Sequence, residues 1–237
     1  MRSIESFWIG LHNMEIIKIK LSVSNAYLVK DRKSILVDTG SSHEADKILA
    51  EVKRAGVNEK DISLILHTHG HVDHAGSTAE LKRRLGVPVA VHAEDAFMLK
   101  TGTNGTVNPI NFSAAIYKQL LVKPFEPSQP DLEIDKEMTL KEFGVNARVV
   151  FTPGHTKGSL SILLGNKEAI IGDVMMGGFM GGNLFPARPM VHYFFENFSE
   201  VRSSIKKVIE YKPSKLYVGH GGPLSLDAVI SRFSNQI

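Results

Sequence analysis

Residues 66–76, with the sequence LHTHGHVDHAG, constrain this chain more than any other feature. They hold four histidines and one aspartate within eight consecutive positions, although the whole 237-residue chain has only ten histidines. The run lies at the end of residues 61–68, whose apolar pattern predicts a buried β-strand. Single histidines are usually core or surface groups, but a spaced H-x-H-x-D-H run directly after a buried strand rarely arises by chance. We therefore interpret it as a metal site.

The spacing within this run favours two metal positions over one. His69 and His71 are two residues apart, so in an extended or turning segment both imidazoles lie on the same side and can reach one ion. Asp73 and His74 follow where a helix is expected to begin, and the turn can direct them to a second, neighbouring point. One ion seldom accepts four ligands from six residues while keeping a position for substrate. His67 lies further back, where it could support a ligand.

The rest of the chain supplies further donors. There is no cysteine, which excludes a disulfide framework, a cysteine nucleophile and thiolate ligands, so a metal must be held by imidazole and carboxylate. Such a set suits zinc, iron or manganese. His155 in FTPGHTKGS, Asp173 in IIGDV and His220 in YVGHGGP each end an expected strand beside glycine, which lets the backbone turn sharply.

Composition limits the class of protein. Hydrophobic residues make up 43% of the chain and charged residues 22%, as in a globular protein that buries a core. The first twenty residues do not resemble a signal peptide, and no segment is apolar enough for a membrane helix, so we expect a cytoplasmic protein without a membrane partner. The net charge of +3 is too small to indicate nucleic acid, and KRR at 82–84 is expected on a solvated helix face. A small-molecule substrate is therefore expected.

The order of the elements predicts the fold. Strands are expected at 15–21, 25–30, 34–39, 61–68, 87–92, 147–152, 159–164, 168–173 and 215–220. Helices are expected at 41–56, with Ser41 or Ser42 as N-cap, at 77–86, at 197–212 and from Leu226. This order indicates an α/β protein of two half-domains, each a sheet with covering helices, that meet in a four-layer αββα sandwich. Residues 100–130 interrupt this alternation of strands and helices. They predict a helical and loop insertion within a single domain over 1–237.

The motifs together resemble a known family. THGHVDHAG, TPGHTKGS, GD and GHG, with VDTG near the start, are similar to the five ordered motifs of the metallo-β-lactamase-fold superfamily, across roughly residues 24 to 222. The glyoxalase II and lactonase branch is the most similar. The resemblance implies an αββα sandwich of the metallo-β-lactamase type, with the metals at one edge.

The resemblance also assigns ligands. The first ion would be held by His69, His71 and His155, and the second by Asp73, His74 and His220. Asp173 would bridge the two ions. Asp38, in LVDTG, would orient a metal-bound imidazole through its other ring nitrogen.

The chemistry expected of such a site is hydrolysis. Two divalent ions about 3.5–4 Å apart, expected to be zinc ahead of iron or manganese, can share a water and lower its pKa from about 15.7 toward about 7. The bridging hydroxide would attack a small ester, thioester or lactone, with the second ion stabilising the oxyanion. Asp73 would act as the catalytic residue that orients the hydroxide and shuttles its proton.

Departures from the family pattern argue against several branches of the superfamily and leave three alternative functions. The commonest lactamases have a cysteine ligand, and flavodiiron proteins have glutamate where His71 stands. Only 17 residues follow His220, too few for the helical domain of glyoxalase II. The alternatives are a mononuclear iron enzyme like the persulfide dioxygenases, a nuclease or phosphodiesterase of the same fold, and a metal-binding scaffold without catalysis.

Two segments are expected to form the substrate pocket, residues 100–130 and 174–196. In the second, an apolar wall is expected from Phe179, Met180, Leu184 and Phe185, with Arg188, His192 or Tyr193 facing an anionic or carbonyl group. In the first, apolar residues at helical spacing would close a small core, form a lid or form a homodimer surface. These residues are Phe112, Ile116, Tyr117 and Leu120.

Overall fold

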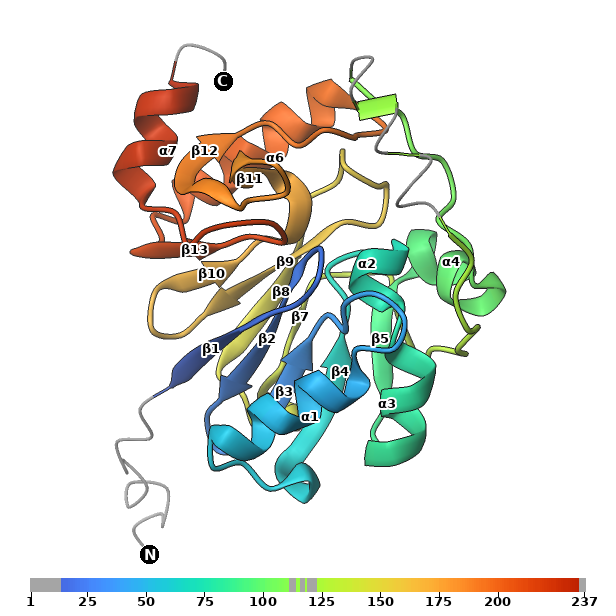
Figure 1. Cartoon of the computed structure of the whole chain (residues 1–237). Helices are drawn as coiled ribbons and strands as arrows, with labels where there is room; N and C mark the ends of the chain where they lie inside the picture. The colour runs from blue at the N-terminus through green and yellow to red at the C-terminus, as the bar shows by residue number, and fades with distance from the viewer. Residues whose placement is uncertain (1–13, 111–113, 116–117, 119–122, 235–237) are drawn as a thin grey trace, which may run out of the picture.

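The computed structural model describes residues 14–110, 114–115, 118 and 123–234 of the chain. Two β-sheets lie against each other, and helices cover the outer face of each (Figure 1). The expected αββα sandwich is confirmed. Within this part of the chain, no helix has the length and apolar character needed to cross a membrane.

The first sheet has six strands in sequence order. They are β1 (Glu15–Lys20), β2 (Asn25–Lys30), β3 (Ser34–Val37), β4 (Ile62–Leu66), β5 (Val89–His92) and β6 (Leu132–Ile134). The first three are antiparallel, and β3 to β6 are parallel. The helices of this half are α1 (Ala45–Arg54), α2 (Val72–Ala75), α3 (Thr78–Leu85) and α4 (Ala96–Thr101). Because parallel strands need crossover connections, α1 and α3 follow β3 and β4 and return the chain along the outer face.

The second sheet has five strands in the order β13, β10, β9, β8 and β7. Their bounds are Lys215–Tyr217, Glu168–Ile170, Leu160–Leu164, Ala147–Phe151 and Met138–Thr139. Helices α6 (Phe198–Glu210) and α7 (Leu226–Phe233) cover it. A separate antiparallel hairpin consists of β11 (Met176–Phe179) and β12 (Leu184–Met190). Short 3-10 turns are η2 (Glu59–Asp61), η3 (Ala93–Asp95), η4 (Lys141–Phe143) and η5 (Gly172–Val174).

Alternation along the strands builds three apolar cores, one for each space between layers. In β2, Leu28 packs in the same cluster as Ile48 of α1, whereas Tyr27 and Val29 lie in the cluster between the two sheets. Successive side chains of a strand point to opposite faces, so one strand supplies both cores.

The second sheet follows the same pattern. Ile162 of β9 lies in the cluster between the sheets, and its neighbour Leu163 packs with Val201 and Ile205 of α6. Both sheets are therefore covered on both faces, which explains why the central strands β3, β4 and β9 are nearly continuous apolar runs that could be recognised in the sequence.

Helix α1 begins later than expected. Its N-cap is Glu44, without a side-chain cap, so the prediction of Ser41 or Ser42 was wrong. The Glu44 carboxylate accepts hydrogen bonds from the backbone N–H groups of Ser22 and Ser41, both at 2.7 Å. Glu44 therefore fixes the loop between β1 and β2, which contains Ser22, against the segment that leads into α1.

The expected insertion is only partly described. Residues 114, 115 and 118 are helical, whereas Phe112, Ile116, Tyr117 and Leu120 lie outside the described residues. Val107 and Ala114 pack against Phe194 in a small cluster of their own. Pro109 also pairs with Phe194 through an isolated β-bridge, so this segment lies against the chain that follows the hairpin.

The core between the sheets provides a direct stability test. Leu64 of β4 is fully buried there, whereas Leu132 of β6 is 37% exposed. Leu64→Ala should lower the free energy of unfolding by about 2–5 kcal/mol, because it removes apolar contacts and leaves a cavity. Leu132→Ala should cost clearly less in the same chemical denaturation experiment. Equal losses would contradict the described packing.

Candidate metal centre

Loops from both sheets bring the predicted donors together at one end of the sandwich. Asp38 follows β3, and residues 67–74 follow β4. In the second sheet, His155 lies in the loop after β8 and Asp173 in η5 after β10. His220 follows β13. Because each loop leaves the same end of its sheet, residues far apart in the sequence meet here.

The donor atoms form four overlapping groups, in each of which the ligand atoms lie within 4.8 Å of one another. The groups are His69, His71 and His155; His69, His74 and Asp173; Asp73, His74 and His220; and His155, Asp173 and His192. The structure thus brings all seven sequence-predicted ligands together. It adds His192, which the sequence suggested only as a substrate-facing residue.

Asp173 lies at the centre of the cluster. Its Oδ2 atom is 3.5 Å from Nε2 of His74 and 3.5 Å from Nε2 of His155, which belong to the two different predicted ligand sets. Nε2 of His220 is 3.3 Å from the same oxygen, and Nε2 of His69 is 3.9 Å away. A carboxylate between two sets of imidazoles has the position that a bridge between two cations requires.

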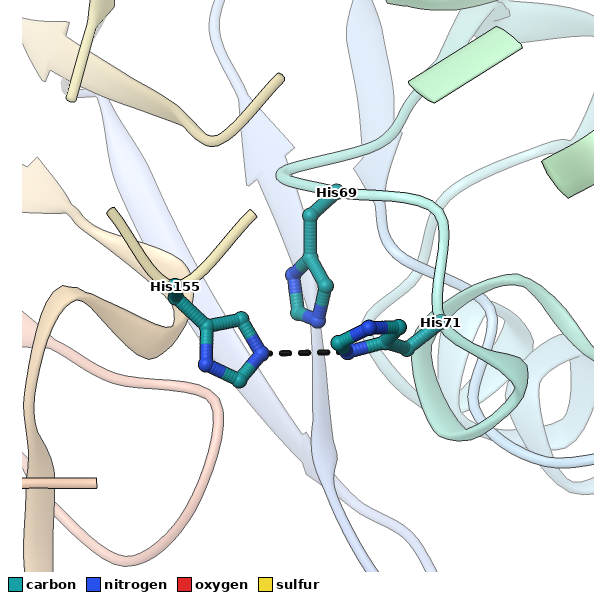
Figure 2. A group of neighbouring side chains, drawn as sticks. All are labelled: His69, His71 and His155. Carbon is teal, nitrogen blue, oxygen red and sulfur yellow. Dashed lines mark hydrogen bonds between the residues drawn. The ribbon is translucent and has the colours of Figure 1, made fainter. Parts of the chain in front are cut away.

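Figure 2 shows three histidines that approach one another from two loops. Nδ1 of His71 and Nε2 of His155 are 3.1 Å apart. The rings of His69 and His155 lie edge to face with centroids 4.7 Å apart. Three imidazoles around one point are a known ligand set for zinc in hydrolytic sites that leave a further position open.

The ring nitrogens that face away from the cluster are held by backbone carbonyls. Nδ1 of His155 donates a hydrogen bond to Phe194 O at 2.8 Å, and Nδ1 of His220 donates to Val23 O at 3.1 Å. Nδ1 therefore carries a proton in both rings, and in the neutral form of each ring Nε2 has its lone pair available for the cluster. Such contacts orient metal-binding histidines and fix their tautomer.

Asp38 holds His74 in the same way. Its Oδ2 accepts a hydrogen bond from Nδ1 of His74 at 2.9 Å. Thr68 donates to Asp38 twice, from its backbone N–H and from Oγ1, both at 2.8 Å. Asp38 is 1% exposed and has a φ of 62°, a region in which aspartate and asparagine are the best tolerated residues after glycine. The structure thus places Asp38 against the outer nitrogen of a predicted ligand.

His67 lies beside this contact and not in the cluster. Its Nδ1 is 3.7 Å from Asp38 Oδ1, and its Nε2 is 3.0 Å from Thr78 Oγ1. It is in none of the four donor groups. Its place is next to the residue that orients His74.

Charges within the cluster act strongly on one another. Burial alone would raise the pKa of the Asp73 and Asp173 carboxyls, but the surrounding histidines hold both well below the usual range. Burial alone would lower the pKa of His220, but the two carboxylates raise it to about 10. Burial lowers the pKa of His71 to about 3. Positive charge is therefore favoured near the carboxylates, and a divalent ion supplies it when it replaces protons on the ligands.

Unpaired buried atoms show that the site fits a metal. Nε2 of His69, Nε2 of His71, Nε2 of His74 and Oδ1 of Asp173 are buried and have no hydrogen-bond partner among the residues that the structure describes. Buried polar atoms are nearly always paired, because a lost partner costs about 1–3 kcal/mol. Several unpaired donors in one cluster of imidazole and carboxylate are explained by a bound cation.

A cavity of about 280 Å³ opens beside the cluster. The donors that line it are His71, Asp73, His155, Asp173, His192 and His220. The rest of the wall is mainly apolar and comprises Val23, Val72, Val107, Met176, Met180, Gly181, Tyr193 and Phe194, with Ser22, Asn104 and Asn183 as polar residues.

The structure places only some of the predicted pocket residues in the wall of the cavity. His192 and Tyr193 line the cavity. Leu184 and Phe185 lie on the β11–β12 hairpin and are 46% and 63% exposed, outside the lining. Arg188 is also outside, with its guanidinium 5.4 Å from the ring centre of Phe179. The hairpin contributes to the cavity through other residues.

Sequence reasoning missed part of the wall. Met176 and Asn104 line the cavity, although the sequence did not single them out. Asn104 Oδ1 accepts a hydrogen bond from the N–H of Val72 at 2.7 Å, so it also fixes the turn that carries Asp73. Its neighbourhood, TGTNGTVNP, looks like an ordinary loop, and no local signal distinguishes this asparagine.

Comparison with known proteins agrees with this geometry. A family model described as the metallo-β-lactamase superfamily matches residues 19–220. A probable metallo-hydrolase of Methanocaldococcus jannaschii is 32% identical over 202 residues, which cover 84% of this chain and 87% of that protein. The hydroxyacylglutathione hydrolase GloC of Haemophilus influenzae is 27% identical over 179 residues, covering 73% and 77%.

Solved structures share the fold. The BLEG-1 B3 metallo-β-lactamase matches with a TM-score of 0.68 over 92% of this chain and 97% of that chain, at 22% identity. At this identity the likeness concerns the arrangement of the elements, and the site must be judged from its own residues.

The contact between Asp38 and His74 generates a prediction about metal affinity. Asp38→Asn keeps the size and tolerates the positive φ, but it removes a negative acceptor from Nδ1 of His74. The affinity for one divalent ion should fall about 10–100-fold, measured by competition with a chelating dye. Asp46→Asn, at an 89% exposed side chain, is the matched control and should bind as the wild type does. Unchanged affinity in a folded Asp38→Asn protein would contradict the orienting role.

Proposed function

Since the chain belongs to the metallo-β-lactamase superfamily and is a metal-dependent hydrolase, we propose that it uses two divalent ions to hydrolyse a small, uncharged ester, thioester or lactone. The observation that carries this proposal is the division of six donors into two sets of three around the seventh, Asp173. One set is His69, His71 and His155, and the other is Asp73, His74 and His220. Divalent ions, of which zinc best suits this imidazole-rich set, would lower the pKa of a water toward about 7 and polarise the substrate oxygen.

Asp73 is the residue that we assign to proton transfer. Its side chain is 17% exposed and lines the cavity, unlike the fully buried His74. Its Oδ2 is 3.3 Å from Nε2 of His220, and its low pKa keeps it ionised as an acceptor. A carboxylate at the cavity wall can orient the attacking water and take up its proton.

His192 and Tyr193 are the polar residues that we assign to substrate. Nδ1 of His192 is 3.2 Å from both the N–H and the carbonyl oxygen of Phe194, so this contact is compatible with either ring tautomer. Nε2 lies at the cavity wall, 3.1 Å from Oδ2 of Asp173, so a substrate carbonyl or departing oxygen bound beside that carboxylate would be within its reach. The Tyr193 hydroxyl accepts from the N–H of Met180 at 3.2 Å, which ties it to the hairpin.

The cavity wall favours an uncharged substrate. Among the described lining residues, none is lysine or arginine, and valine, methionine, tyrosine and phenylalanine side chains make most of the wall outside the donor cluster. A phosphodiester or a carboxylate-bearing carrier usually needs basic partners, so the wall favours an ester, thioester or lactone with an apolar part. Of the substrate indicated by the name hydroxyacylglutathione hydrolase, only the thioester bond is compatible with this wall, because the glutathione carrier bears carboxylates.

A substrate panel and one variant test the proposal. Protein reconstituted with zinc should hydrolyse lactones or thioesters faster than a phosphodiester, and should not consume oxygen with a persulfide. Asp73→Asn should lower kcat about 10²–10⁴-fold, because the proton acceptor is lost. Asp46→Asn, on the surface, should retain activity. Oxygen consumption with a persulfide, or full activity of Asp73→Asn, would refute the proposed reaction.

A further inference from the structure

Asp95 is a buried carboxylate outside the cavity that contacts two loops carrying predicted metal ligands. It lies where η3 ends and α4 begins, and it is 1% exposed. It does not line the cavity and is in none of the donor groups. The sequence analysis did not single it out, because an aspartate after a strand in HAED resembles an ordinary helix start.

Three hydrogen bonds join Asp95 to these loops. Its Oδ2 accepts from the N–H of Gly70 at 3.0 Å and from Oγ1 of Thr156 at 2.7 Å. Its Oδ1 accepts from the N–H of Gly158 at 3.0 Å. Gly70 stands between His69 and His71, and Thr156 directly follows His155. The carboxylate therefore connects the two segments that supply all three histidines of the first set.

These segments come from different sheets. The loop with Gly70 follows β4 of the first sheet, and the loop with Thr156 and Gly158 follows β8 of the second. One backbone hydrogen bond joins them at their base, from the N–H of Leu160 to Thr68 O at 2.8 Å. Asp95 adds side-chain contacts to both loops closer to the histidines, at Gly70 and Thr156, and so holds the distance across which His155 meets His69 and His71.

Both loops reach Asp95 through glycine. A Cβ at Gly158 would lie 2.5 Å from Cγ of Asp95, and a Cβ at Gly70 would lie 3.0 Å from its backbone oxygen. A side chain at Gly158 would push its loop away from the carboxylate, and one at Gly70 would clash with Met98 and with the backbone of Asp95. Gly70 and Gly158 thus permit a close approach to the segment that carries Asp95.

The burial of this carboxylate is costly. Burial raises its pKa to about 6 in spite of the three hydrogen bonds, and the charged residue that adds to the shift is another acid, Glu196. No cationic partner of Asp95 is found among the described residues, so its hydrogen bonds must offset the free-energy cost of burying the carboxylate. The three donors belong to the ligand loops, so the energy of the carboxylate depends on where those loops lie.

We propose that Asp95 is the positioning residue of the first metal position, holding the His69–His71 segment and the His155 segment at the separation that one ion requires. The inference rests on the proposed two-metal function. The proposed role concerns the first metal position alone. None of the three hydrogen bonds of Asp95 involves Asp73, His74 or His220, which form the second set.

Metal titration of the full-length protein tests this role without reference to substrate. In Asp95→Asn, the side-chain NH2 cannot accept a hydrogen bond where a carboxylate oxygen did, so one loop loses its anchor. The affinity for one of the two ions should fall about 10–100-fold while the other is retained. Zinc competition with a chelating dye measures both steps. Asp31→Asn is the matched control and should leave both affinities unchanged. Asp31 also links the two halves, because it accepts a hydrogen bond from the N–H of Asn146 at 2.7 Å, but it lies at the end of the strands opposite to the cluster.

A second variant covers the case in which Asp95→Asn does not fold. Thr156→Val removes one of the three donors with little change in size, and it should weaken the same ion by a smaller factor. Thr156→Ser keeps the hydroxyl and should restore the affinity. In a His155→Asn background, which lacks the first position, Asp95→Asn should cause no further loss for the remaining ion.

The outcomes separate this inference from the proposed function. Two ions bound equally well by Asp95→Asn and wild type would overturn the role of Asp95 and leave the function standing. Equal weakening of both ions, or a lower melting temperature with unchanged metal affinity, would show a merely structural role and also overturn it. A single ion in the wild type would refute the two-metal function, whereas weakening of that ion by Asp95→Asn would still support the positioning role.

Discussion

Five histidine nitrogens face one carboxylate oxygen at the end of this sandwich. They lie 3.1 to 3.9 Å from Oδ2 of Asp173, in a place from which solvent is largely excluded. Such a collection of buried donors is stable only if charge and lone pairs are balanced, and a cation is the simplest way to do so. The rest of the structure can be understood as what brings these groups together: two sheets that end at the same edge, and loops that leave each strand toward the other sheet.

Support for the donors is spread around the cluster. Asp38 orients His74, Phe194 O orients His155 and Val23 O orients His220. Each contact fixes which ring nitrogen keeps its lone pair, so the site depends on residues that never touch an ion. The apolar wall of the cavity then selects which substrate reaches the cluster. Metal binding and substrate selection therefore depend largely on different residues of the chain.

Local patterns made much of the fold predictable. Strands covered on both faces appear as continuous apolar runs, and the spacing of residues 69–74 already divides the donors between two sets. The sequence pattern predicts no strand between residues 173 and 215, because paired glycines and two prolines hide the alternation of the hairpin β11–β12. Its tip carries Leu184 and Phe185 into solvent, where sequence alone suggested a pocket wall. Asn104 and Asp95 act through contacts between distant segments, and such contacts leave no periodic signal in the sequence.

The two sets of donors imply two ions, one on either side of the Asp173 carboxylate. Anomalous diffraction at the zinc edge, from crystals of the reconstituted protein, would locate them. We expect two peaks about 3.5–4 Å apart, with Asp173 between them. One should be bounded by His69, His71 and His155, and the other by Asp73, His74 and His220. A single peak, or two peaks that do not share Asp173, would contradict this arrangement.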